Sequence, residues 1–197
     1  MGSGIRQSLV IGWAAIHAIL GPASAAFADD PRTSITINQG FGTLSGIHEV
    51  SSLQWNFTDA YFTGVMVSHR LFDTGIGLSF DLEGHINRHY GSGEYWEGVA
   101  AVGARWDRFP WSDRLYTGLA VTTGTSYNTG RSGVEETRQT RTSRALQYLG
   151  IEIEAAPSAE SPWSVTTRLH HRSGVFGLYD SVIGGSNYFS IGVRRRF

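Results

Sequence analysis

The chain has 197 residues, no cysteine and a formal net charge of −1, which excludes a disulfide-stabilised scaffold and a generally basic nucleic-acid-binding surface. Its 25 glycines and 12% aromatic residues suit a β-rich protein. All 16 basic residues are arginines, and the guanidinium group suits bidentate contacts with phosphate or carboxylate.

The N-terminal segment has the features of a secretory signal peptide. Arg6 precedes an apolar run at residues 9–20, and residues 26–28 form a small-x-small cleavage site. We therefore expect residues 1–28 to be removed and residues 29–197 to form a single domain. The alternative is an N-terminal membrane anchor, but the apolar run is short and ends in Gly-Pro.

Eight later segments alternate between apolar and polar residues with a period of two, as β-strands do. In the clearest, residues 76–90, Leu78 and Leu82 fall on one face whereas Asp81 and Glu83 fall on the other. Less strict alternation runs through residues 34–42, 60–72, 95–107, 115–127, 143–155, 163–173 and 187–197. Most of these segments are long enough to cross a membrane as tilted strands, and no later stretch is apolar for long enough to cross it as a helix.

The connectors between these segments alternate in length. The longer ones are residues 43–59, 91–94, 128–142 and 174–186, and the tight turns are residues 73–75, 109–113 and 157–162. Outer-membrane barrels have short periplasmic turns and longer extracellular loops, so we expect both termini in the periplasm. The segment at residues 51–57 also alternates, but an even strand count assigns it to the first long loop.

The chain ends in an amphipathic segment whose last residue is Phe197. This ending resembles the terminal signature by which the insertion machinery recognises bacterial outer-membrane barrels. The polar strand faces also carry charges that suit the interior of a small membrane barrel: Asp81, Glu83, His85, Arg105, Glu152, Glu154, Arg168 and Arg194. We therefore predict an all-β fold, an eight-stranded antiparallel transmembrane β-barrel of the bacterial outer membrane. The alternative is a soluble barrel such as a lipocalin, whose apolar faces point inward.

One predicted strand carries polar residues on its apolar face. Because residues i and i+2 share a face, His171 and Ser173 lie on the side of Leu169, which is expected to face lipid. Asn187 falls on the outward face of the last strand, and we expect it roughly opposite Ser173 with His171 as a diagonal neighbour. Polar groups that remain unpaired against lipid cost free energy. The presence of His171, Ser173 and Asn187 on this face therefore indicates a functional role.

A serine hydrolase would supply that function. His171 would act as general base on the Ser173 hydroxyl, the serine would attack an acyl ester, and Asn187 would fix the tautomer of the imidazole. Backbone N–H groups around Gly174 would stabilise the oxyanion. Alternatively, His171 and Ser173 are ordinary polar residues at the level of the lipid headgroups.

These residues also carry a resemblance to a known family. His171-Arg172-Ser173-Gly174, a Gly-rich loop, Asn187-Tyr188-Phe189 and a last strand ending in Phe resemble the C-terminal region of the PagL-type lipid A 3-O-deacylases. The resemblance implies an outer-membrane barrel that removes an ester-linked acyl chain from the lipid A of lipopolysaccharide in the outer leaflet. It also implies that His171 is the base and Ser173 the nucleophile. The sequence contains no Walker-type loop or dinucleotide fingerprint, so we expect no cofactor.

Two positions depart from that pattern. The family often has Asn after the serine, where this chain has Gly174, and an acidic third member, where this chain has Asn187. An amide orients a histidine but supplies no negative charge to the imidazolium. We therefore expect a weaker enzyme, an inactive relative, or an enzyme that uses Asp180 of the preceding loop as its acid.

Other functions receive less support from the sequence. His85, His89, His170 and His171 fall on different predicted strands and faces, and no tight ligand spacing indicates a metal site. An arginine cluster in the third long loop would suit lipid A phosphates or would simply be solvated beside Glu135 and Glu136; its members are Arg131, Arg138, Arg141 and Arg144. The alternative to an enzyme is a non-enzymatic small barrel with a structural or surface-interaction role.

Overall fold

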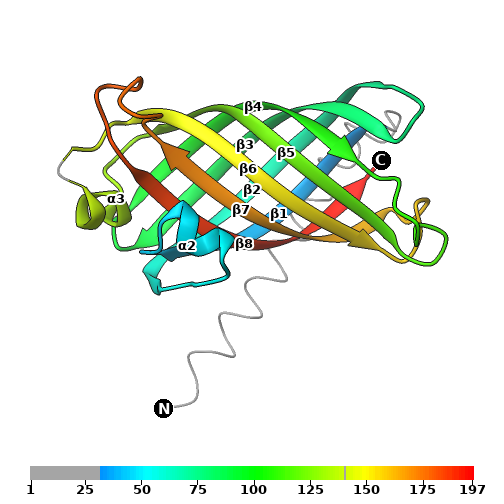
Figure 1. The fold of residues 1–197 in the computed structure, drawn as a ribbon, viewed down its shortest axis with the longest axis horizontal. Coiled ribbons are helices and arrows are strands. Elements are labelled where there is room, and N and C mark those ends of the chain that lie inside the picture. The colour runs from blue at the N-terminus through cyan, green and yellow to red at the C-terminus, as the bar shows by residue number, and fades with distance from the viewer. Residues whose placement is uncertain (1–31, 140) are drawn as a thin grey trace, which may run out of the picture.

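The computed structural model describes residues 32–139 and 141–197, which form a closed antiparallel barrel of eight strands (Figure 1). Each strand pairs with its neighbours in sequence, and the last strand pairs with the first. The strands are β1 (Thr33–Thr43), β2 (Phe57–Asp73), β3 (Leu78–Gly91), β4 (Tyr95–Trp106), β5 (Tyr116–Asn128), β6 (Ala145–Ala156), β7 (Trp163–Ser173) and β8 (Gly185–Arg196). The predicted signal peptide, residues 1–28, lies outside the described residues.

The strand prediction is confirmed, with shifts of a few residues at the ends. The largest shift at the start of a strand is in β2, which begins at Phe57 instead of residue 60. The assignment of residues 51–57 to a loop is correct up to that residue, since a short helix, α2 (Ile47–Ser51), and an irregular segment precede β2. β3 begins two residues later than predicted because Gly75 and Gly77, with φ of 77° and 95°, form the turn before it.

The barrel is apolar outside and polar inside. Ile86 on β3 is 63% exposed and Val102 on β4 is 53% exposed, and similar side chains continue around the wall. Aromatic residues mark both ends of this belt, with Trp96 and Tyr127 at one end and Trp163 at the other. An exposed apolar band between two aromatic girdles is the exterior of a barrel surrounded by lipid. No helix in the described part of the chain is long and apolar enough to cross a membrane.

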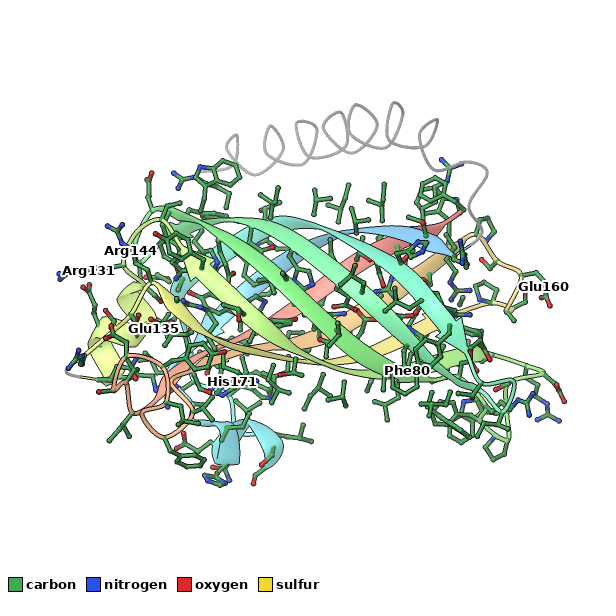
Figure 2. The ribbon with its side chains drawn as sticks, turned by 90° about the horizontal axis from the view of Figure 1, so that it is seen from above. Phe80, Arg131, Glu135, Arg144, Glu160 and His171 are labelled. Carbon is green, nitrogen blue, oxygen red and sulfur yellow. The ribbon has the colours of Figure 1, made fainter. Side chains whose placement is uncertain are left out.

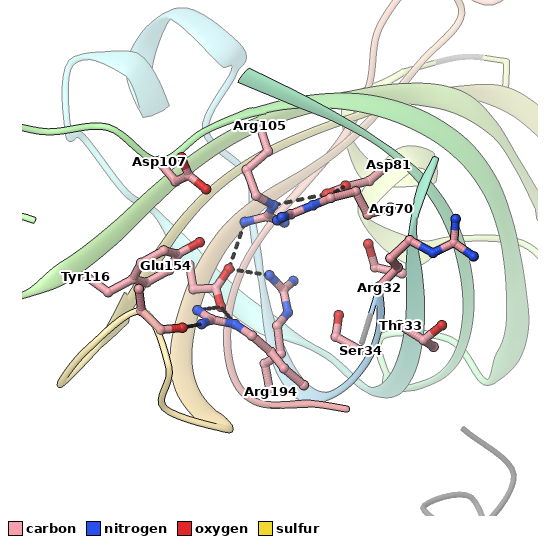
Figure 3. A pocket seen from close by; sticks show the side chains of 13 residues that line it. Arg32, Thr33, Ser34, Arg70, Asp81, Arg105, Asp107, Tyr116, Glu154 and Arg194 are labelled. Carbon is pink, nitrogen blue, oxygen red and sulfur yellow. Dashed lines mark hydrogen bonds and ion pairs between the residues drawn. The ribbon is translucent and has the colours of Figure 1, made fainter. Parts of the chain in front are cut away.

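The interior is held together by buried ion pairs. The Arg168 guanidinium donates to Glu83 Oε2 at 2.7 Å and to Glu152 Oε2 at 2.7 Å, and its Nη1 also donates to the Tyr148 hydroxyl at 2.9 Å. Nearer the end that carries the C-terminus, Arg105 and Arg194 both donate to Glu154 Oε2, at 2.7 and 2.6 Å (Figure 3). These arginines are at most 4% exposed, so each buried charge has an opposite charge beside it.

The long connectors lie at the opposite end from the C-terminus (Figure 1). α2 lies against the outer wall beside β8, and a second short helix, α3 (Gly133–Arg138), lies at the mouth of the barrel. Inside that mouth, Val134 of α3 packs with Phe62 and Tyr188. The loops therefore cover both the opening and one side of the wall.

Replacing Arg168 with alanine is expected to destabilise the barrel by about 3 kcal/mol, because it leaves Glu83 and Glu152 buried without this partner. The measurement is the temperature at which the folded band of the purified, detergent-solubilised protein converts to the unfolded band in electrophoresis. Arg114→Ala, at an exposed position in the β4–β5 turn, is the control. Equal conversion temperatures for the two variants would show that the interior pairs add no stability.

Candidate active site on the outer wall

The strand register brings His171 and Asn187 face to face. In the β7–β8 pair His171 lies opposite Asn187, and Ser173 lies opposite Gly185. The expectation that Asn187 faces Ser173 is therefore wrong by two residues. The difference favours a catalytic arrangement, since directly paired side chains approach more closely than diagonal ones.

His171 and Asn187 form a direct hydrogen bond. His171 Nδ1 and Asn187 Oδ1 are 2.6 Å apart, and Asn187 Nδ2 donates to the Ser45 carbonyl oxygen at 2.8 Å. Because the amide NH₂ is directed at Ser45, its oxygen faces the imidazole, so Nδ1 carries the proton. His171 is thereby held in the tautomer that leaves Nε2 free to accept a proton.

The loop between β1 and β2 buries Asn187. This side chain is only 1% exposed, so the prediction that it faces lipid is wrong. Ser45 is fixed in turn, since its backbone N–H donates to Thr43 Oγ1 at 3.1 Å and its hydroxyl accepts from the Asn56 N–H at 2.9 Å. On the same side of the wall, the Trp55 ring packs edge-on against Phe189 at 5.5 Å. The loop therefore acts as a rigid cover over the outer surface of β8.

Ser173 lies beside His171 on the outward face of β7, but its hydroxyl has another partner. Ser173 Oγ donates to Gln147 Oε1 on β6 at 3.3 Å, and no hydrogen bond joins Ser173 to His171 among the described residues. The long distance indicates a weak bond. Rotation about the Cα–Cβ bond of Ser173 redirects the hydroxyl without moving the backbone.

Asp180, the alternative acid, does not meet His171 in this structure. Its Oδ1 accepts from Arg141 Nη2 at 3.2 Å, and it lines a different cavity, beside Arg144 and Glu135. The Nδ1 position of His171 is occupied by Asn187. The residue that orients His171 is thus an amide.

An apolar groove surrounds the polar group. Its volume is about 440 Å³, and it is lined by Ile47, Arg138, Gln147, Leu149, His171, Ser173, Val175, Phe176, Ile183, Gly184, Gly185 and Asn187. His171 lies toward the loop end of the barrel, above α2, whereas Glu160 marks the opposite end (Figure 2). The size of the groove is that of a small-molecule pocket, and its open side faces the surrounding lipid.

Gly174 is required by close packing of the loop that follows it. A Cβ atom at this position would lie 2.0 Å from the Val182 carbonyl oxygen, so the β7–β8 loop excludes any side chain there. The Gly174 N–H, expected to stabilise an oxyanion, instead donates to the Gly184 carbonyl oxygen at 3.0 Å. Next along the chain, the amides of Val175 and Phe176 make no backbone hydrogen bond among the described residues, and both residues line the groove.

Three of the four singled-out histidines come together, which the sequence did not indicate. His89 and His170 both contact the Glu97 carboxylate inside the barrel, at 2.9 and 3.0 Å, and the His85 ring lies 6.5 Å from that of His170. Only His171 of the four is on the outside. The described residues contain no group of three or more side chains suited to hold a metal ion.

Sequence reasoning missed two partners of the site. Gln147 was part of a predicted strand, and its outward direction follows from the same alternation that located Ser173. Ser45 acts through its backbone carbonyl oxygen, for which the sequence carries no signal.

Gly174→Ala is expected to destabilise the β7–β8 loop by about 1 to 3 kcal/mol, since its methyl group overlaps Val182. The measurement is the rate of proteolytic cleavage in residues 174–184 of the folded protein in detergent. Gly84→Ala is the matched control, because a Cβ there meets nothing within 4 Å. Unchanged cleavage in Gly174→Ala would contradict the close packing.

The comparisons with known proteins bear on the fold. No protein-family model matches the sequence, and no curated protein is significantly similar to it. Among solved structures, the outer membrane enzyme PagL is similar with a TM-score of 0.57 and 15% identity, over 82% of this chain and 99% of that chain. Neisserial surface protein A has a TM-score of 0.51 and 12% identity, over 84% of this chain and 97% of that chain.

Identities this low show a shared fold and no more. The fold agrees with the other observations, namely the closed eight-stranded sheet, the exposed apolar belt with aromatic girdles and the charged interior. The chain is a small eight-stranded β-barrel of the bacterial outer membrane.

Proposed function

We propose that this protein is an outer-membrane esterase that removes an ester-linked acyl chain from the lipid A of lipopolysaccharide. The observation that carries the proposal is the hydrogen-bonded chain from Ser45 through Asn187 to His171, which leaves a basic nitrogen beside Ser173 in a groove open to lipid. PagL, an outer membrane enzyme of the same fold, and the likeness of the C-terminal residues to its family support the proposal.

Each residue has a defined step in this reaction. His171 Nε2 takes the proton of Ser173 Oγ, and the oxygen attacks the ester carbonyl carbon. The tetrahedral intermediate expels the alcohol oxygen of the sugar, which receives the proton from His171. Water, deprotonated by His171, then attacks the acyl-serine, and His171 returns that proton to Ser173 Oγ as the fatty acid leaves. Asn187 keeps Nδ1 protonated throughout, so the imidazole always presents the same nitrogen.

The membrane environment supports this chemistry. Long loops of outer-membrane barrels are extracellular, so His171 and Ser173 lie at the outer leaflet, where lipopolysaccharide resides. Leu149 lies directly opposite His171 on β6 and provides apolar surface for an acyl chain. The Val175 and Phe176 amides are the remaining backbone donors for the oxyanion, because the Gly174 N–H is already bonded.

The alternative is a non-enzymatic small barrel with a structural or surface-interaction role. Two contacts favour it: Ser173 bonds to Gln147 instead of His171, and His171 faces an uncharged amide. The two functions differ in one observable, the acylation of lipid A in cells that make the protein.

Ser173→Ala and His171→Ala are each expected to abolish deacylation, because one removes the nucleophile and the other its base. The measurement is mass spectrometry of lipid A from cells that express each protein, where the wild type and the control variant should show the loss of one hydroxyacyl chain and the two site variants should not. Ser51→Ala, at an exposed serine of α2, serves as the control. Unmodified lipid A with the wild-type protein would support the non-enzymatic alternative.

Asn187→Asp is expected to lower the rate about tenfold, although it introduces the acid typical of triads. An ionised carboxylate at this position has no donor for the buried Ser45 carbonyl oxygen and would place oxygen against oxygen, at a cost of about 1 to 3 kcal/mol. Asn187→Leu, which removes both hydrogen bonds, should be slower still. Initial rates on an ester substrate in detergent give the order, and a faster Asn187→Asp variant would show that charge at this position outweighs the Ser45 contact.

A further inference from the structure

Arg138 is the one permanently charged side chain among the described residues that line the groove. Of the described residues that line this groove, Arg138 alone is an arginine, and none is Asp or Glu. It extends from the last turn of α3 over the edge of β8, where its Nη1 donates to the Gly185 carbonyl oxygen at 3.3 Å. A Cβ built on Gly46 would lie 3.3 Å from Arg138 Nη2, so the guanidinium also reaches the β1–β2 loop.

No ion pair joins Arg138 to an acidic side chain within the described part of the chain, although the Glu49 carboxylate lies nearby, 3.6 Å from the Cβ position on Gly46 that Arg138 Nη2 approaches. Arg131 Nη1 lies 3.4 Å from Glu136 Oε1, and Arg141 Nη2 lies 3.2 Å from Asp180 Oδ1. Neither of these two arginines lines the groove. The predicted arginine cluster therefore separates, and of its four members Arg138 alone lines the groove that holds His171 and Ser173. Most of its N–H groups remain available to an anion.

The position of Arg138 is fixed by the barrel itself. One turn earlier on α3, Glu135 pairs with Arg172 and accepts from the Ser186 hydroxyl at 3.0 Å. Arg172 is the residue between His171 and Ser173, and Ser186 precedes Asn187. The helix that carries Arg138 is thus attached to both strands of the candidate site, which places the start of the Arg138 side chain close to Ser173.

The residues along the wall are in an order that suits an anionic lipid. Ser173 beside Gln147 lies nearer the loop end than His171 opposite Leu149, and Arg138 reaches the groove at Gly185, which is directly opposite Ser173. A cation at the level of the nucleophile, with apolar surface farther from the loops, matches an amphiphile whose charged head lies next to an ester and whose acyl chain runs into the bilayer. Guanidinium pairs with phosphate oxygens through two parallel hydrogen bonds.

We propose that Arg138 binds the phosphate group of a phosphorylated lipid of the outer leaflet and thereby selects which ester reaches Ser173. This inference rests on the proposed esterase and adds its specificity-determining residue. The phosphate fixes the head of the lipid at the rim, and the distance from Arg138 to Ser173 then determines the position along the head at which an ester is cleaved. Lipids without the phosphate lack this anchor and bind more weakly.

The test compares two lipids on full-length protein in detergent micelles: phosphorylated lipid A and the same lipid after phosphatase treatment. Arg138→Gln is expected to raise KM for the phosphorylated lipid about tenfold, as loss of one charge-assisted pair implies, and to leave KM for the dephosphorylated lipid and kcat for both unchanged. Arg131→Gln removes the same charge from the same loop outside the groove and should change neither. Equal effects of Arg138→Gln on the two lipids, or no effect, would overturn the proposal.

A binding measurement separates this proposal from that of the esterase. Titration calorimetry of the two lipids onto Ser173→Ala, with and without Arg138→Gln, needs no turnover. Selective weakening for the phosphorylated lipid supports the anchor even if the wild-type protein hydrolyses nothing, in which case the esterase fails alone. Hydrolysis that depends on Ser173, together with equal binding of both lipids, would leave the esterase and remove the anchor.

Discussion

The buried charges inside the barrel determine which way every residue of β7 points. Arg168 is held between Glu83 and Glu152, and exposure of its guanidinium to lipid would cost several kcal/mol. Since side chains alternate along a strand, an inward Arg168 also fixes His170 and Arg172 inward and His171 and Ser173 outward. A slip of one residue would exchange the two sets. The interior network therefore positions the outer-wall site without contacting it.

The same network limits what the protein can do with its interior. Buried arginines, carboxylates and aromatic rings occupy the axis of the barrel, where the rings of Phe62, His89, His170 and Tyr188 pack together. An eight-stranded barrel is just wide enough for such side chains to fill it. The cavity that remains inside the barrel, near the C-terminus, is lined by charged side chains (Figure 3), whereas the apolar groove lies on the outer wall at the loop end.

The sequence predicts the barrel well and the site in part. Alternation located all eight strands because lipid outside and ion pairs inside impose opposite polarities on neighbouring residues. It placed His171 and Ser173 on one outward face for the same reason. The sequence prediction paired Asn187 with the wrong residue of β7. Alternation fixes the face on which a residue lies, but the intervening loop determines how β7 pairs with β8. A shift of this pairing by two residues leaves every side chain on the same face. The burial of Asn187 depends on the β1–β2 loop, whose path along the wall has no periodic signal.

The two positions that depart from the sequence pattern of the deacylases, Gly174 and Asn187, are explained by loops packed against the site. Val182 leaves no room for a side chain at Gly174. The Ser45 carbonyl oxygen requires a donor from residue 187, and asparagine supplies it while its oxygen still receives the His171 proton. A carboxylate accepts hydrogen bonds only, so it would satisfy His171 but leave Ser45 without a partner. The Asn187 amide therefore forms hydrogen bonds with both neighbours. It lacks the negative charge of an acid, but it holds the histidine in a fixed orientation.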